Sequence, residues 1–136
     1  MALPEVVLVD TSAFYALASR NDEFHERARK TFEALVDREQ RIMTTSYVLV
    51  ETMALIQRRL GFEVLRALID STGRLVETLW VEDGLHSAAW DRLEERKGSG
   101  PSLVDWTIIL SARRLGAHIF AFDSDFSREN VTVLPR

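Results

Sequence analysis

The chain has 136 residues, of which 46% are hydrophobic and 28% charged, and its formal net charge at pH 7 is −4. This length suits one domain with a sizeable buried core, and we expect residues 1–136 to form a single domain. The sequence has no cysteine, which excludes disulfides, thiolate catalysis and cysteine-based zinc sites. The acidic balance excludes a globally basic nucleic-acid binder, but it is compatible with a local basic face.

We expect no targeting segment at the beginning of the chain. Residues 1–5 carry no basic cluster, and the apolar run that follows covers only Val6 to Val9. A membrane span needs roughly 18 consecutive apolar residues, and no stretch of the sequence approaches that length. We therefore expect a cytoplasmic protein without membrane association.

The first strand ends in a carboxylate. Val6 to Val9 are apolar and mostly β-branched, which predicts a strand buried on both faces, and Asp10, Thr11 and Ser12 follow directly. The carboxyl ends of parallel strands border the ligand crevice of an open sheet, so Asp10 is a candidate site residue. Asp10 is equally suited to cap a short helix that ends near Ala18, and the sequence leaves both interpretations open.

A long amphipathic helix is predicted over residues 23–38, with Asp22 as its N-cap. Its apolar face consists of Phe24, Ala28, Phe32 and Leu35. The three histidines of the chain lack the i, i+3 or i, i+4 spacing of a metal pair on a helix. We therefore expect them to have surface or capping roles.

Residues 41–45 predict a second strand, followed by a helix over 47–60 that Ser46 caps and Gly61 ends. Glu51 lies within this helix. The residues three and four positions away from it include no Lys or Arg, so we expect Glu51 on the apolar stripe without a local ion partner. The alternative is a long side chain that reaches water from the edge of that stripe.

The middle of the chain continues the alternation of helices and strands. We expect a helix over 62–71, a strand over 75–81, a turn at 82–84 and a helix over 85–97. The glycine-rich stretch 98–101 is a loop too short to link two domains.

A third acid follows this loop. Ser102 and Asp105 have capping-box spacing, which predicts the start of a helix that runs to about Leu115. Ile108 and Ile109 lie one turn after Asp105, so the acid shares the apolar side of the helix. The capping role and a functional role both remain open for Asp105.

The last buried strand is expected over residues 117–122, and it also ends in acids, Asp123 and Asp125. If this strand lies parallel to the first, Asp123 and Asp10 reach the same edge of the sheet. Residues 131–134 predict a short edge strand. The whole pattern predicts an α/β fold with a mainly parallel sheet.

Four carboxylates are thus expected at one edge of the sheet. They are Asp10, Glu51, Asp105 and Asp123. Without Lys or Arg beside them they would repel one another, so the site calls for a cation. All-oxygen ligands suit Mg²⁺ or Mn²⁺, and such a site supports phosphodiester hydrolysis. Thr11 and Ser12 are suited to hold the Asp10 carboxylate or to contact the phosphate.

These motifs together resemble the PIN domain, and within it the VapC-type toxins of prokaryotic toxin-antitoxin pairs. The matching stretches are residues 9–13, Glu51 after 46–50, residues 102–105 and residues 122–126. The resemblance implies a three-layer α/β/α sandwich and an Mg²⁺- or Mn²⁺-dependent endoribonuclease that acts on RNA. It also implies a homodimer and inhibition by a cognate antitoxin protein.

The resemblance places the family's four acids on Asp10, Glu51, Asp105 and Asp123, with the adjoining hydroxyl on Ser12. Asp125 lies beside the fourth acid and is an alternative for that role. Trp106, next to the third acid, would either narrow the groove or pack beneath it.

Two other functions are compatible with the sequence. One is a PIN-like module without catalysis that acts as a partner-binding scaffold, and the other is a metal-dependent phosphodiesterase with another substrate. The intact set of four acids disfavours the scaffold. Arginines are candidates for phosphate contacts, although each pair also suits the C-terminal dipole of its helix. They are Arg58, Arg59, Arg113 and Arg114. Trp80 and Trp90 are candidates for base stacking, core packing or a dimer interface.

Overall fold

The centre of the structure, a computed structural model that describes residues 6–136, is a five-stranded parallel sheet. Its strands are β1 (Val6–Val9), β2 (Arg41–Thr45), β3 (Val76–Leu79), β4 (His118–Phe120) and β5 (Val133–Leu134). The strand order is β3-β2-β1-β4-β5, so β1 lies in the middle. Leu8 pairs with Met43 of β2 on one side and with Ile119 of β4 on the other. The predicted parallel arrangement of the first and last buried strands is confirmed.

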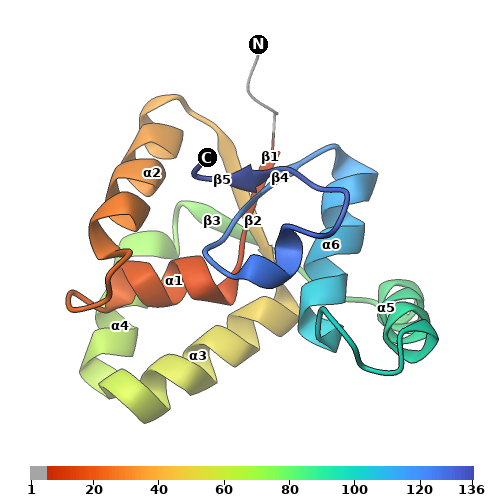
Figure 1. Cartoon of the computed structure of the whole chain (residues 1–136). Coiled ribbons are helices and arrows are strands. Elements are labelled where there is room, and N and C mark those ends of the chain that lie inside the picture. The colour runs from red at the N-terminus through yellow and green to blue at the C-terminus, as the bar shows by residue number, and fades with distance from the viewer. Residues whose placement is uncertain (1–5) are drawn as a thin grey trace.

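Helices cover both faces of this sheet. They are α1 (Thr11–Ala18), α2 (His25–Asp37), α3 (Ser46–Leu60), α4 (Phe62–Thr72), α5 (Asp83–Glu95) and α6 (Leu103–Leu115), and a short 3₁₀ helix, η1 (Ser124–Phe126), follows β4. Figure 1 shows α2 and α4 to one side of the sheet and α5 and α6 to the other. The expected three-layer α/β/α sandwich is therefore confirmed.

The core lies along β1, β4 and α6. Val7, Leu8 and Val9 have no exposed surface, and neither do Ile108 and Ile119. Helices on both faces explain why these strands read as continuous apolar runs without alternation. The chain therefore reaches Asp10 directly from a buried strand.

Several predicted boundaries differ from the observed ones by one or two residues, and three of them concern helix starts. The helix α2 begins at His25, and Asp22 instead accepts a hydrogen bond from the backbone N–H of Phe24 at 2.8 Å. The cap of α3 is Thr45, because it is the last extended residue, and its hydroxyl accepts from the backbone N–H of Val48. The helix α5 begins at Asp83, inside the expected turn. The stops at Gly61 and Gly116 are confirmed.

No helix within residues 6–136 is long and apolar enough to cross a membrane. The expectation drawn from residues 1–5 lies outside the described part of the chain.

Candidate active site

A cleft of about 310 Å³ opens at the carboxyl ends of the central strands. Parallel strands β1 and β4 end side by side there, and the backbone N–H of Asp10 donates to the carbonyl of Phe120 at 2.9 Å. The residues that line the cleft are Asp10, Thr11, Ser12, Tyr15, Asp22, Phe24, Glu51, Leu55, Arg59, Asp105, Phe122 and Asp123. The structure therefore brings all four predicted acids, together with Thr11 and Ser12, to one cleft.

Asp10 is both a helix cap and a lining residue of this cleft. Its Oδ2 atom accepts from the Ser12 backbone N–H at 3.0 Å and from the Ser12 hydroxyl at 2.7 Å. Asp10 is only 3% exposed, and this burial raises the pKa of its carboxyl to about 7. The Ser12 hydrogen bonds oppose that rise, and the charge of Asp105 adds to it. The capping interpretation is thus confirmed, and it does not compete with a place in the cleft.

The two hydroxyls after Asp10 anchor different parts of the cleft. Ser12 Oγ, besides donating to Asp10, accepts from the backbone N–H of Phe122 at 2.9 Å, which ties the start of α1 to the exit of β4. Thr11 Oγ1 accepts from the hydroxyl of Thr52 on α3 at 3.1 Å. Ser12 therefore orients Asp10, whereas Thr11 fixes the helix that carries Glu51.

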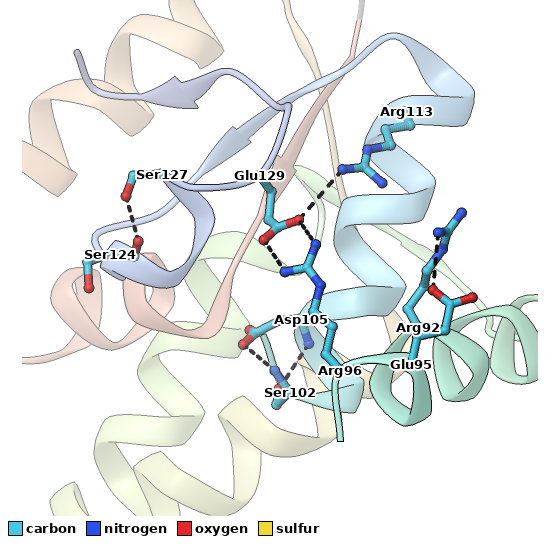
Figure 2. Close-up of polar contacts among 9 residues, drawn as sticks. All are labelled: Arg92, Glu95, Arg96, Ser102, Asp105, Arg113, Ser124, Ser127 and Glu129. Carbon is cyan, nitrogen blue, oxygen red and sulfur yellow. Dashed lines mark hydrogen bonds and ion pairs between the residues drawn. The ribbon is translucent and has the colours of Figure 1, made fainter. Parts of the chain in front are cut away.

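Asp105 lies at the buried start of α6. Its Oδ2 atom accepts from the Ser102 backbone N–H at 3.0 Å, and its own backbone N–H donates to Ser102 Oγ at 3.1 Å, which completes the predicted capping box (Figure 2). Asp105 is 8% exposed. Burial raises the pKa of its carboxyl, the Ser102 hydrogen bonds lower it, and the charges of Asp123 and Glu51 raise it further. Asp105 thus interacts electrostatically with each of the other three acids.

Glu51 reaches the cleft from an exposed position on α3. The expectation that it lies on the apolar stripe is wrong, because the buried side of α3 is formed by Val48, Thr52 and Ile56, at intervals of four residues. Glu51 lies at the edge of that side and is exposed, as in the alternative of a long side chain that reaches water. Its charge nevertheless acts on buried Asp105.

Two acids come from η1 and the residue before it. Asp123 is half-buried and caps η1 by accepting from the Asp125 backbone N–H at 2.9 Å. One carboxylate oxygen from each of Asp105, Asp123 and Asp125 lies within 4.8 Å of the others, a spacing suited to a shared metal ion. Asp125 is exposed and does not line the cleft, in contrast to Asp123.

Comparison with known proteins identifies the family of this chain. The family model for the PIN domain matches residues 7–130. The chain belongs to the PIN domain family. It is 32% identical over 126 residues to the 23S rRNA-specific endonuclease VapC20 of Mycobacterium tuberculosis (strain ATCC 25618 / H37Rv), an alignment that covers 90% of this chain and 92% of VapC20.

Solved structures share this fold. The crystal structure of Mycobacterium tuberculosis VapC20, described as a Sarcin-Ricin loop cleaving toxin, matches with a TM-score of 0.78 and 30% identity, covering 93% of this chain and 96% of VapC20. The crystal structure of VapBC2 from Rickettsia felis bound to a DNA fragment from their promoter matches with a TM-score of 0.71 and 17% identity, covering 94% and 96%.

The basic residues of this PIN domain fall into different environments. Arg59 is the one cationic side chain among the described residues that line the cleft, whereas its neighbour Arg58 does not line it. Arg113 is engaged elsewhere, with Nη2 at 3.8 Å from Glu129 Oε1. Trp106 is almost fully buried and does not line the cleft, so it packs beneath the site. Trp80 is 71% exposed, so core packing is excluded for it.

Sequence reasoning did not identify the aromatic wall of the cleft. Phe24 stacks on Phe122 with ring centroids 4.7 Å apart, and Tyr15 lines the same cleft. The helical spacing of Phe24 matched a core position, and no sequence signal distinguishes an aromatic residue at the edge of the core from one inside it.

Proposed function

We propose that this PIN domain, formed by residues 1–136, is a VapC-type toxin that hydrolyses phosphodiester bonds in ribosomal RNA with Mg²⁺ or Mn²⁺. The observation that carries the proposal is the convergence of four acids from separate elements on one cleft. The 32% identity to a 23S rRNA-specific endonuclease supports RNA as the substrate. The same kinship supports a homodimer in the cytoplasm that a cognate antitoxin holds inactive.

The residues of the cleft fit a hard divalent cation. The proposed ligands are Asp10, Glu51, Asp105 and Asp123, with Asp125 near the last of them, and all of them offer oxygen atoms. Burial raises the pKa values of Asp10 and Asp105, and no Lys or Arg is among the groups that shift them, so a bound cation would favour their ionised forms. A bound ion would supply Lewis-acid stabilisation of the phosphate and a water of lowered pKa.

The side chains around the acids have supporting roles in this proposal. Both hydrogen bonds from Ser12 end on Asp10 Oδ2 and orient the carboxylate that would hold the cation. The Asp105 capping box likewise uses Oδ2 and keeps the carboxylate fixed at the start of α6. The Arg59 guanidinium lines the same cleft and suits an RNA phosphate.

Removal of the divalent ion tests this function. We expect purified protein to cleave 23S ribosomal RNA with Mn²⁺, to lose cleavage with excess EDTA, and to regain it when Mn²⁺ is restored. The metal should also raise the melting temperature, because an ion that binds the folded state stabilises it. DNA of matched sequence serves as the control substrate and should remain intact. The absence of both cleavage and a metal-induced rise in melting temperature would refute the proposal.

Arg59→Ala should lower kcat/KM for RNA cleavage by about tenfold, because one charge-assisted hydrogen bond is worth about 1.5 kcal/mol. The slope of the logarithm of the RNA-binding constant against the logarithm of the salt concentration should also become shallower by about one. Arg58→Ala is the matched control, since it removes the same charge from the same turn of α3 but outside the cleft. Equal effects of the two substitutions would show that Arg59 contributes only general charge.

A further inference from the structure

An ion pair between the exposed guanidinium of Arg96 and the buried carboxylate of Glu129 joins segments next to Asp105 and Asp123. The Glu129 side chain is only 4% exposed. Arg96 donates to both of its oxygens, from Nη1 to Oε2 at 2.7 Å and from Nη2 to Oε1 at 3.0 Å. Figure 2 shows Glu129 between Arg96 and the more distant Arg113. None of these three residues lines the cleft, so the pair has no direct access to substrate there.

Such an ion pair contributes little to the free energy of unfolding, but it orients the two segments that carry it. Desolvation of the Glu129 carboxylate offsets part of its attraction to the exposed Arg96, so a well-packed apolar pair can be equally stable. A bidentate Arg–carboxylate contact, in contrast, fixes the relative geometry of the two segments that carry it. The question is therefore which segments this pair joins.

On one side, the pair is attached to the start of α6. Arg96 is the C-cap of α5, and its guanidinium carbon lies 4.9 Å from the centre of the Trp106 ring. Trp106 is 1% exposed and directly follows Asp105 in the chain. The Arg96 side chain thus contacts the residue next to the buried acid of α6.

On the other side, the pair is attached to η1. The backbone N–H of Glu129 donates to the carbonyl of Phe126 at 3.1 Å, and Phe126, the last residue of η1, is fully buried. Within the described residues from 123 to 130, Glu129 is the side chain that forms ion pairs with other elements. It therefore anchors the segment that holds Asp123 and Asp125.

We propose that Arg96 and Glu129 are positioning residues that set the spacing of Asp105 relative to Asp123 and Asp125. The three carboxylates that approach within 4.8 Å of one another come from the two segments that the pair joins. This inference rests on the proposed function, because the spacing matters through the metal that these acids hold. Loss of the pair loosens the metal site without removing any ligand.

Glu129→Gln is expected to weaken Mn²⁺ binding and to lower kcat by about 10-fold to 100-fold each, the usual effect of losing a residue that orients metal ligands. The KM for RNA should stay within about twofold, since Glu129 lies outside the cleft. Calorimetric titration of the metal-free protein with Mn²⁺ measures the affinity independently of activity. The matched control is Arg92→Met, which removes an exposed ion pair from α5, with Arg92 Nη1 3.5 Å from Glu95 Oε2, and should change neither value.

The double variant Arg96→Met/Glu129→Met separates positioning from stability. An apolar pair can preserve the melting temperature, so a preserved melting temperature with weakened Mn²⁺ binding supports positioning. Wild-type Mn²⁺ affinity in a folded double variant overturns the inference, as does wild-type affinity in Glu129→Gln. If neither variant melts cooperatively, the pair serves the fold and the inference also fails. A wild-type protein that neither binds Mn²⁺ nor cleaves RNA would instead refute the proposed function itself.

Discussion

Asp10→Asn is expected to lower kcat for RNA cleavage by at least about 10³-fold, because metal stabilisation of a transition state is worth several kcal/mol and each ~1.4 kcal/mol is a factor of ten. The substitution removes the charge of the most buried proposed ligand but keeps a carbonyl oxygen. That oxygen can still accept the Ser12 hydrogen bonds that cap α1. Single-turnover cleavage of 23S ribosomal RNA with saturating Mn²⁺ measures the effect without a contribution from product release.

The melting temperature of the same variant distinguishes a lost ligand from a lost fold. Burial raises the pKa of Asp10 from 3.8 to about 7 in the metal-free protein. The stabilisation that its protonated form contributes is complete below pH 3.8 and is lost as the pH rises through 7. Asn does not titrate, so from pH 5 to pH 8 the melting temperature of metal-free Asp10→Asn should rise relative to wild type. Mn²⁺ should raise the melting temperature of wild type more than that of the variant. A cleavage rate of Asp10→Asn within about tenfold of wild type would contradict the role of Asp10.

The sheet and the positions of two acids were predictable because they depend on one local rule. An apolar run without alternation indicates a strand buried on both faces, and both such runs end in a carboxylate, at Asp10 and Asp123. Parallel pairing of β1 with β4 then brings the two ends together. The capping box at Ser102 and Asp105 was equally local, and the structure contains it.

The environment of Glu51 was not predictable from its helical neighbours. Periodicity identifies an apolar side of α3 but not which of its residues meets the core, and Val50, 64% exposed, shows that apolar character alone does not decide this. The rotation of the helix about its axis also distinguishes Arg59, which lines the cleft, from Arg58, which does not. That rotation depends on contacts of α3 with α1 and α6, which lie far from it in the sequence, as well as with its neighbour α4.

Contacts between residues far apart in the sequence could not be predicted from local sequence patterns. The Thr52 hydroxyl meets Thr11 across 41 positions, and the Thr45 hydroxyl lies 3.0 Å from that of Thr107 across 62 positions. Glu129 follows an exposed turn, and no local sequence signal predicts its burial. Its partner Arg96 lies 33 positions away in the sequence. These residues support the site through tertiary contacts, and such partners are visible only once the fold is known.

The two acids after β4 should differ strongly in their contributions. We propose that Asp123 is the fourth ligand, because it lines the cleft and its charge acts on Asp105, whereas Asp125 is exposed and outside the lining. Asp123→Asn is therefore expected to lower kcat by at least about 10²-fold, and Asp125→Asn by less than about tenfold. Asn at position 123 can still accept the Asp125 backbone N–H, so η1 should keep its cap.

Comparison of the two variants under identical Mn²⁺ concentrations tests this assignment, with Asp70→Asn on α4 as a control for loss of an exposed acid. Because Asp125 lies in the same group of oxygens within 4.8 Å, it has the reach to replace a lost neighbour. Excess Mn²⁺ should then partly restore Asp123→Asn but not the double variant Asp123→Asn/Asp125→Asn. A larger loss of kcat from Asp125→Asn than from Asp123→Asn would reverse the assignment and make Asp125 the fourth ligand.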